Sequence, residues 1–356
     1  MRAFLVASLL TVFGVTTWSA AADRPARTMP KADTVRERFL KLIERPRVPA
    51  NATVKQAGTQ NGLVESTFAF DSEAGQRVPG IMVSPKAGPE KHSVVIVLHG
   101  TGGSKQAMLP LLQQFAKRGL IGVAIDGRFA GERSGGTSGT TAYQAAILET
   151  WKTGKGLPFF YDTVWDLLRL IDYLETRSDV DTKKIGAIGF SKGGIELYLA
   201  AAVDERLAAS VPCIGVQSFG WALENNAWQS RVSTIQNAVE SAASDDGVTQ
   251  IDAAFVRRFY DRVVPGIYQE FDGPAMLPLI APRPLFVING DSDDRTPQAG
   301  LQLCVQPARA AYKRAEAAKN FEFLLQPETQ HAVRPESERK AINWLVKHLS
   351  PASGGR

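Results

Sequence analysis

The sequence predicts a single α/β domain with a mostly parallel central sheet of about eight strands, helices on both faces and a helical insertion. Three observations predict this fold. Short apolar runs alternate along the chain with segments of helical periodicity. The 356 residues are enough to bury one large core. A Gly-x-Ser-x-Gly pentapeptide stands between an apolar run and a helical segment, where a sharp strand-to-helix turn is expected.

The composition and net charge of the chain argue against nucleic-acid binding and against a metal site formed by cysteines. The net charge of +5 is mild, and the basic residues are dispersed. Because no Lys/Arg run with interleaved aromatic residues occurs, nucleic acid is not expected as a partner. The two cysteines, Cys213 and Cys304, lack metal-ligand spacing. We expect two buried free thiols rather than the disulfide that an exported protein would permit.

The N-terminus has the layout of a secretory signal peptide. Arg2 gives a positive start, residues 3–15 are apolar, and the small residues at 19–22 allow cleavage after Ala21 or Ala22. Residues 1–22 are therefore predicted to be removed, which gives a secreted or periplasmic protein without stable membrane insertion. The alternative is an uncleaved membrane anchor, for which the apolar run is marginal in length.

Residues 23–356 are predicted to form one folded domain, because they contain no internal repeat and no low-complexity linker. Its first part, residues 33–85, precedes the central strands. Apolar residues at helical spacing predict a helix over 34–44. Two alternating segments, 63–70 and 77–83, predict a hairpin because a polar turn separates them.

From residue 93 onward, predicted strands and helices alternate. The continuous apolar run 93–98 suits a central parallel strand. The segments that follow are helix 105–118, strand 120–125, a Gly/Ser/Thr-rich loop 127–159 with a short helix near 142–151, helix 161–176, strand 184–189, helix 191–202, strand 208–214, strand 284–289, helix 299–317, strand 320–325 and helix 336–349. Such alternation predicts a parallel sheet covered on both faces.

A long insertion separates strands 208–214 and 284–289. Residues 217–276, about 60 in number, are too many to be structureless in a compact domain, and their apolar residues have helical spacing. The insertion leaves the sheet at its carboxyl edge, where ligands bind in open α/β sheets. We therefore expect a cap over the site, with Trp221 and Trp228 as candidate substrate-binding residues. Alternatively, these aromatic residues only pack the insertion onto the body.

The pentapeptide is Gly189-Phe190-Ser191-Lys192-Gly193. The bare pattern is weak, but its place between a buried strand and a helix is typical of a nucleophile elbow. The flanking glycines are expected because Cβ atoms would clash in so tight a turn. The turn would expose the Ser191 hydroxyl at the carboxyl edge of the sheet.

A second loop, His99-Gly100-Thr101-Gly102-Gly103, follows strand 93–98. In the elbow architecture this loop donates one N–H of the oxyanion hole, and the residue after the nucleophile donates the other. The backbone N–H groups of Thr101 and Lys192 are therefore the candidates. The alternative is a plain glycine turn in which His99 bonds locally.

The general base is chosen among four histidines. His92 lies at the wrong edge of the sheet, His99 lies in the oxyanion loop, and His348 lies in the last helix. Only His331 follows the last strand at the carboxyl edge, where the chain order serine, acid, histidine requires the base.

The acid is expected after strand 284–289. The segment there contains Asp291, Asp293 and Asp294. One of the three carboxylates should orient His331, and these residues alone do not decide which one. Clusters of Asp, Gly and Pro also form ordinary turns, and Asp294 could pair locally with Arg295.

With these sites in place, the chain resembles the α/β-hydrolase superfamily, in its dienelactone hydrolase, acetyl xylan esterase and prolyl-oligopeptidase-like branch, over roughly residues 63–349. The motifs that carry the resemblance are the loop 99–103, the pentapeptide 189–193, the run 281–284 leading into 290–297, and His331. In that branch the acid is the first Asp of an Asp-Asp-Arg step, which falls on Asp293. Two departures, the absence of glycines around His331 and Lys192 after the nucleophile, remove no catalytic group.

The resemblance implies a serine esterase that needs no metal or organic cofactor and hydrolyses a small-molecule ester through an acyl-enzyme. Acetyl and carbohydrate-linked esters are among the candidate substrates. A serine peptidase of the prolyl-oligopeptidase type is the second hypothesis, although too few residues precede strand 93–98 for a full propeller. The third is a non-catalytic binding protein on the same fold.

Overall fold

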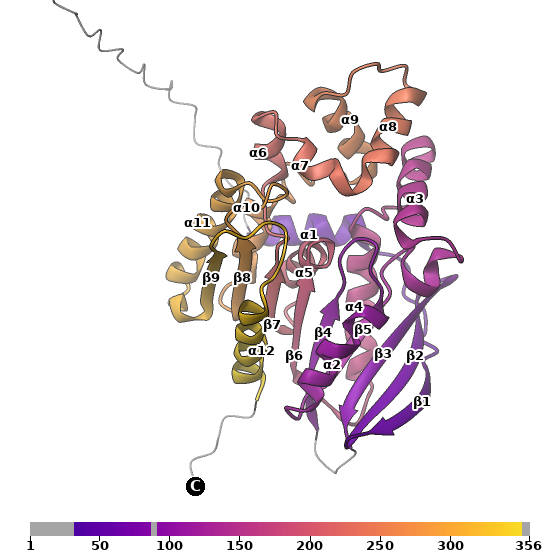
Figure 1. Ribbon diagram of the computed structural model, residues 1–356, viewed down its shortest axis with the longest axis vertical. Coiled ribbons are helices and arrows are strands. Elements are labelled where there is room, and N and C mark those ends of the chain that lie inside the picture. Colours follow the sequence, from indigo (N-terminus) through magenta and orange to yellow (C-terminus); the bar gives the residue numbers. More distant parts are fainter. Residues whose placement is uncertain (1–31, 87–90, 351–356) are drawn as a thin grey trace, which may run out of the picture.

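The computed structural model describes residues 32–86 and 91–350. In these ranges the strands form one sheet of nine strands in the order β1-β2-β3-β5-β4-β6-β7-β8-β9 (Figure 1). The strands are β1 (Thr53–Gln60), β2 (Leu63–Glu73), β3 (Gln76–Pro85), β4 (His92–Leu98), β5 (Ile121–Ile125), β6 (Val180–Phe190), β7 (Leu207–Cys213), β8 (Leu285–Gly290) and β9 (Phe321–Gln326). Pairs among β1, β2, β3 and β5 are antiparallel, and those from β5 through β4 to β9 are parallel. The predicted mostly parallel sheet is confirmed.

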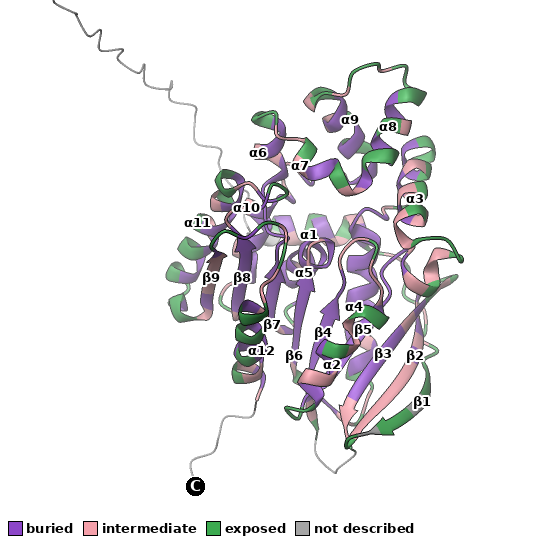
Figure 2. Ribbon diagram, viewed as in Figure 1, coloured by how far each residue is buried: buried purple, intermediate pink, exposed green. Residues whose placement is uncertain are grey.

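Helices cover both faces of the sheet because its central strands are apolar on both sides. β4 is buried from Ser93 to Leu98, as expected of a central parallel strand (Figure 2). One core lies under α1 (Ala32–Ile43), α4 (Tyr161–Glu175), α5 (Lys192–Val203) and α11 (Gln298–Arg314). The second core lies under α2 (Leu109–Ala116) and α12 (Pro335–Leu349).

The strand β1 was not predicted from the sequence. Its segment, TVKQAGTQ, is polar and has no alternating apolar pattern. β1 is held by backbone pairing with β2 at the edge of the sheet, and Val54 is 51% exposed there. The spacing of apolar residues reflects which side chains are buried, so an exposed edge strand is difficult to recognise from its sequence.

The insertion 217–276 is helical, as predicted. It contains α6 (Phe219–Glu224), α7 (Gln229–Val232), α8 (Gln236–Asp245), α9 (Ala253–Val263) and α10 (Gly273–Met276). The helices α6 to α9 stand at the carboxyl edge of the parallel strands (Figure 1). They cover the end of the sheet from which the predicted site loops emerge.

A further helix joins this cap from a segment predicted to be mostly loop. α3 spans Gly139–Thr153, longer than the expected helix near 142–151. Ser138 caps its first turn by accepting a hydrogen bond from the N–H of Thr141, and Gly154 ends it in the left-handed conformation. Its Gln144 side chain accepts a hydrogen bond from the N–H of Ala238 on α8, which ties the two helices together.

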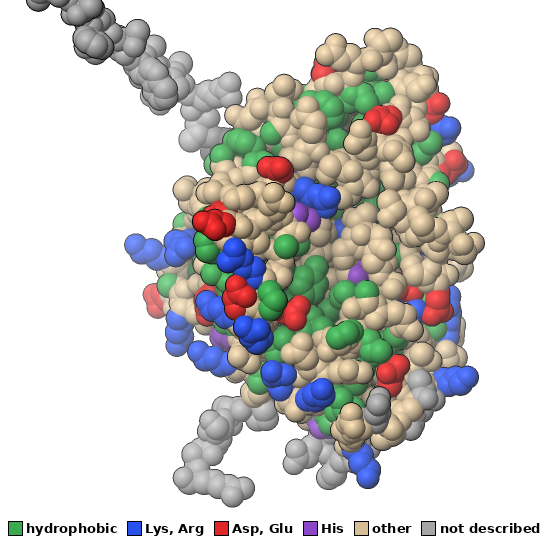
Figure 3. All heavy atoms as spheres, in the orientation of Figure 1, with side chains coloured by type: hydrophobic (Ala, Val, Ile, Leu, Met, Phe, Trp, Pro, Cys, Tyr) green, Lys and Arg blue, Asp and Glu red, His purple; other side chains and the backbone are tan. Residues whose placement is uncertain are grey.

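Both cysteines are buried free thiols, as expected. In the described ranges no helix has the length and apolarity that crossing a membrane requires. Figure 3 shows basic side chains intermixed with acidic ones on the face that it presents.

Candidate active site

Ser191 stands between β6 and α5 in a strained backbone conformation, with φ 53° and ψ −114°. The glycines on either side are required by close contacts. A Cβ on Gly189 would lie 2.2 Å from the carbonyl oxygen of Gly193, and a Cβ on Gly193 would lie 2.6 Å from that of Leu98. The sharp turn that the pentapeptide predicted is therefore present, and it exposes the Ser191 side chain at the carboxyl edge of the sheet.

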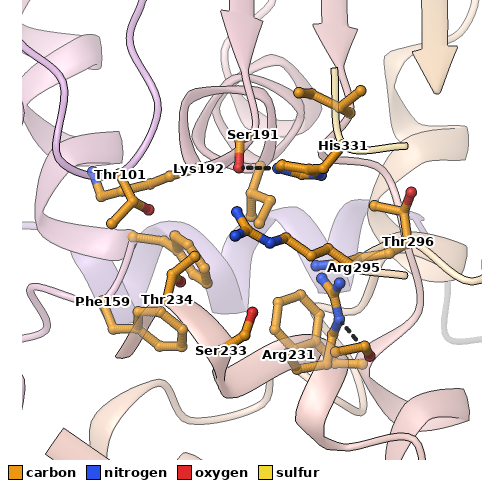
Figure 4. Close-up of a pocket in the computed structure, with 16 residues that line it drawn as sticks. Thr101, Phe159, Ser191, Lys192, Arg231, Ser233, Thr234, Arg295, Thr296 and His331 are labelled. Atoms are coloured by element: carbon orange, nitrogen blue, oxygen red, sulfur yellow. Dashed lines mark hydrogen bonds between the residues drawn. The ribbon is translucent and has the colours of Figure 1, made fainter. Parts of the chain in front are cut away.

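Three side chains from three loops form one hydrogen-bonded chain. His331 Nε2 lies 2.8 Å from Ser191 Oγ, and His331 Nδ1 lies 2.8 Å from Asp293 Oδ2. Figure 4 shows the first of these contacts. The structure thus brings together the three residues that the sequence proposed as nucleophile, base and acid.

A glycine at the end of β8 allows the loops of Asp293 and His331 to meet. A Cβ on Gly290 would lie 2.1 Å from the carbonyl oxygen of Thr329, so any larger residue would push the two loops apart. Asp291 lies at the surface and accepts hydrogen bonds from Ser292 Oγ and the N–H of Thr329. Asp294 is exposed. Of the three candidate carboxylates, Asp293 is the one in contact with His331.

The surroundings of Asp293 favour its ionised form. Burial alone would raise the pKa of this carboxyl group, but hydrogen bonds from His331, from Thr296 Oγ and from the N–H of Arg295 hold the pKa below its ordinary value. An ionised Asp293 accepts the Nδ1–H of His331. Nε2 is then free to accept the proton of the Ser191 hydroxyl.

The loop after β4 packs directly on the elbow. A Cβ on Gly100 would lie 3.3 Å from the carbonyl oxygen of Phe190 and 3.5 Å from Ser191 Cβ. Thr101 and Lys192 both line the cavity that contains Ser191, and they lie beside it in Figure 4. Lys192 is the first residue of α5, so its N–H has no acceptor within the helix. Both predicted oxyanion-hole residues are therefore next to Ser191.

His99 holds this loop in place. It is buried, its Nδ1 lies 2.8 Å from the carbonyl oxygen of Gly100, and its Nε2 accepts a hydrogen bond from the N–H of Gly127. Burial and the nearby charge of Lys192 lower the pKa of His99 to about 4. A neutral ring with Nδ1–H satisfies both contacts, so His99 is bonded locally within the loop that carries Thr101.

The side chain of Lys192 turns away from the candidate oxyanion hole into the protein. Its ammonium group is buried, pairs with the carboxylate of Glu196 and lies 5.1 Å from the ring centre of Tyr143. Tyr143 comes from α3, so this helix of the cap also supports the elbow. An oppositely charged residue four positions along a helix is a weak signal in the sequence for such a pair.

Two connected cavities meet at Ser191 and His331. The inner cavity is the smaller of the two, and its walls combine polar and charged side chains with the apolar side chains of Phe159, Phe160, Ile195, Ile214 and Phe219. The outer cavity is larger and has hydroxyl and amide walls, to which Thr140, Gln144, Ser233, Thr234, Gln236 and Asn237 contribute. Arg295 lines both. The insertion therefore does form part of the wall around Ser191.

The two tryptophans predicted to form the pocket line neither cavity. Trp221 packs on α11, where a Cβ on Gly300 would lie 3.1 Å from its ring. Trp228 is half-buried and packs on the larger of the two cores. Nearness in sequence to the end of β7 does not decide which side of α6 faces the cavity. Phe219 and Arg231 of the same insertion face it instead.

Comparison with known proteins relates the chain to families of esterases. Residues 33–218 match the acetyl xylan esterase (AXE1) family, and residues 151–315 match the fungal glucuronyl esterase family. The protein YtaP of Bacillus subtilis is 24% identical over 310 residues, which cover 83% of this chain and 92% of YtaP. A 4-O-methyl-glucuronoyl methylesterase of Hypocrea jecorina is 26% identical over 224 residues, which cover 57% of this chain and 45% of that enzyme.

Among solved structures, Acetyl Xylan Esterase 1 from Thermoanaerobacterium superposes with a TM-score of 0.63 at 18% identity, over 90% of this chain and 95% of that one. At that identity the likeness concerns the fold, which is that of α/β-hydrolases. The chain spans less than half the length of the fungal methylesterase that it matches. Neither a peptidase nor a non-catalytic binding protein is favoured by these relatives. The match over more than half of its residues shows that this chain belongs to the acetyl xylan esterase (AXE1) family and is a serine esterase, a carboxylic-ester hydrolase.

Proposed function

We propose that Ser191 is the nucleophile of ester hydrolysis, His331 its general base and Asp293 the acid that orients the base. The observation that carries the proposal is the unbroken hydrogen-bonded chain from Ser191 through His331 to Asp293 at the junction of the two cavities. The strained turn at Ser191 supports it, since such strain clusters at active sites.

Hydrolysis would proceed through an acyl-enzyme. His331 Nε2 takes the hydroxyl proton as Ser191 Oγ attacks the ester carbonyl, and the N–H groups of Thr101 and Lys192 face the developing oxyanion. The C–O bond to the alcohol then breaks, and His331 returns the proton to the leaving oxygen. Water repeats the sequence on the acyl-enzyme and releases the acid. Asp293 stays ionised throughout and stabilises the imidazolium.

We further propose that the alcohol part of the substrate is a carbohydrate. The outer cavity is lined by side chains that donate and accept hydrogen bonds, including Thr140, Gln144 and Asn237, and sugar hydroxyls need such partners. The match to the acetyl xylan esterase family supports the same substrate class, because in an acetylated xylan the sugar is the alcohol part of the ester.

A direct test compares substrates of both classes on purified protein. Acetylated xylo-oligosaccharides, in which the sugar is the alcohol part, should be hydrolysed with higher kcat/KM than p-nitrophenyl acetate, and aminoacyl-p-nitroanilides should not be cleaved. Ser191→Ala, with the wild-type melting temperature, should lose all of these activities. Cleavage of the anilides, or ester hydrolysis that persists in Ser191→Ala, would contradict the proposal.

We also propose that the protein is exported and loses residues 1–22. The support is the order of a positive residue, an apolar stretch and small residues at the N-terminus. These residues lie outside the described ranges of the structure.

A further inference from the structure

The inner cavity contains a buried arginine without a counter-ion. Arg231, on α7, is 8% exposed and lines the cavity beside Ser191. Its Nε donates to Ser230 Oγ, and its guanidinium group lies 5.6 Å from the ring centre of Phe219. Its Nη2 has no hydrogen-bond partner, and within the described ranges Arg231 forms no ion pair. Figure 4 shows the side chain at the wall of the cavity.

An unpaired charge in such a place is costly. Burial lowers the pKa of Arg231 to about 10, yet the group remains protonated at neutral pH. Asp272 and Asp293 are near enough to act on it through space, but neither is in contact with it. A buried cation with a free N–H is stabilised when an anion joins it, because the pair replaces the lost hydration.

A second unpartnered polar side chain faces the same cavity. Gln217 is 1% exposed, and neither its Nε2 nor its Oε1 has a hydrogen-bond partner. Gln217 and Arg231 both line the inner cavity, so a ligand there would meet amide and guanidinium donors together. Arg295 adds an exposed guanidinium group at the junction of the two cavities. The polar groups of this cavity therefore favour an anion with oxygen acceptors.

We propose that the inner cavity binds a free carboxylate on the acyl group of the substrate, held by Arg231 and Gln217. The preferred substrates would then be half-esters of dicarboxylic acids, or acyl groups that bear an acid close to the ester. This inference rests on the proposed ester hydrolysis at Ser191. The planar fork of a guanidinium group matches the two oxygens of a carboxylate.

The acyl group is assigned to the inner cavity for a steric reason. The alcohol leaves first and needs the wider outer cavity as its exit, whereas the acyl group stays bonded to Ser191. The inner cavity is the smaller one, and Phe159, Phe160 and Ile195 can contact the methylene carbons between the two carboxyl groups. The free carboxylate takes part in no bond making or breaking.

The test measures a ratio of kcat/KM values in a pH-stat at neutral pH. Monomethyl succinate carries the free carboxylate, and dimethyl succinate is its neutral counterpart. Wild-type protein should prefer monomethyl succinate by about 10-fold or more. In Arg231→Met this ratio should fall by about 30-fold or more, because one partner of a buried charge pair is removed. Arg231→Lys, which retains the charge, should restore part of it.

Arg258→Met is the matched control. Arg258 lies in the same insertion with its guanidinium group over the ring of Phe255, but it lines neither cavity. This variant should keep the wild-type ratio. If Arg231→Met does not fold, an inhibition assay on the wild-type protein takes the place of the comparison of kcat/KM ratios. It measures how succinate and butyrate inhibit the hydrolysis of p-nitrophenyl acetate. Succinate should then inhibit at concentrations at least about 10-fold below those of butyrate.

The outcomes separate this inference from the proposed function. If neutral esters are hydrolysed in a Ser191-dependent way but dimethyl succinate is the better substrate, the carboxylate site is refuted and the esterase proposal stands. A ratio that is the same in Arg231→Met, or inhibition by butyrate equal to that by succinate, also refutes the site. If no ester is hydrolysed, the proposed function itself fails.

Discussion

At the scale of single residues, the site depends on positions where a larger side chain would clash with neighbouring backbone. Ser191 adopts a backbone conformation that most side chains avoid, and it can do so because Gly189 and Gly193 let the neighbouring backbone approach. Gly290 serves the same purpose between the loops of Asp293 and His331. The exposed hydroxyl and its two partners are thus positioned by the backbone rather than by flexible side chains.

Asp293→Asn tests the assignment of the acid. An amide at this position would favour the wrong tautomer of His331, so kcat should fall by about 10³- to 10⁴-fold while the melting temperature changes little. Asp294→Asn, the neighbouring and exposed carboxylate, is the control and should retain most of the activity. A larger loss at Asp291→Asn than at Asp293→Asn would move the acid to the other carboxylate.

His99 predicts a dependence of stability on pH. Its pKa is lowered to about 4 from the ordinary 6.5, so between these values the unfolded chain binds the proton more tightly than the folded protein. The free energy of unfolding should therefore decrease as pH falls from 6.5 to 4, by up to about 1.4 kcal/mol per pH unit from this residue. The free energy of unfolding, measured with denaturant at several pH values, should fall less steeply with pH in His99→Gln than in wild type. His92→Gln is the control and should behave like wild type. The same dependence of the free energy of unfolding on pH in wild type and His99→Gln would contradict this role of His99.

The three residues of the candidate triad could be selected from the sequence because each member follows a strand, and chain order then leaves few choices. Ser191 and His331 followed from the elbow and from the position of the last strand, and Asp293 followed from the resemblance. Arg231 could not be found in this way. An arginine in a helical insertion is ordinarily solvated, and only the packing of α6 and α7 reveals that this one is buried beside Ser191.

At the scale of elements, the cap is formed by two segments far apart in the chain. The insertion 217–276 was predicted from its length and periodicity. α3 was only partly predicted, because its glycine-rich approach suggested a loop, and its contacts with α8 and Lys192 are tertiary. The edge strand β1 was missed because hydrogen bonds to β2, rather than burial, hold it in place.

The walls of the inner cavity predict which side chains set the acyl preference. Ile195→Ala, on α5 at the wall of the inner cavity, should shift the preference from acetyl toward butyryl p-nitrophenyl esters by about 10-fold. Trp221→Ala should lower the melting temperature but keep the wild-type preference, because this ring packs on α11. A changed preference among acyl chain lengths in Trp221→Ala, with an unchanged preference in Ile195→Ala, would show that the acyl group binds elsewhere.

At the scale of the whole molecule, two apolar cores fix the sheet on which the loops stand. The parallel strands were predictable because continuous apolar runs mark burial on both faces. The arrangement of the cap over the carboxyl edge was predictable only in outline, since it depends on which faces of short helices pack together.

The proposed export is tested on the mature protein. After expression of the full chain in its native host, intact mass spectrometry should show a start at Ala22 or Asp23 in the secreted or periplasmic fraction. A membrane-bound form that keeps Met1 would favour the alternative of an uncleaved anchor.

The central claim is that Ser191 is the nucleophile, and its most direct test is covalent labelling by a fluorophosphonate. Wild-type protein should gain one adduct, and peptide mapping should place it on Ser191. His331→Ala should label far more slowly, since the base that activates the hydroxyl is absent. Ser191→Ala should not be labelled at all. An adduct on another serine, or labelling of Ser191→Ala at the wild-type rate, would contradict the account.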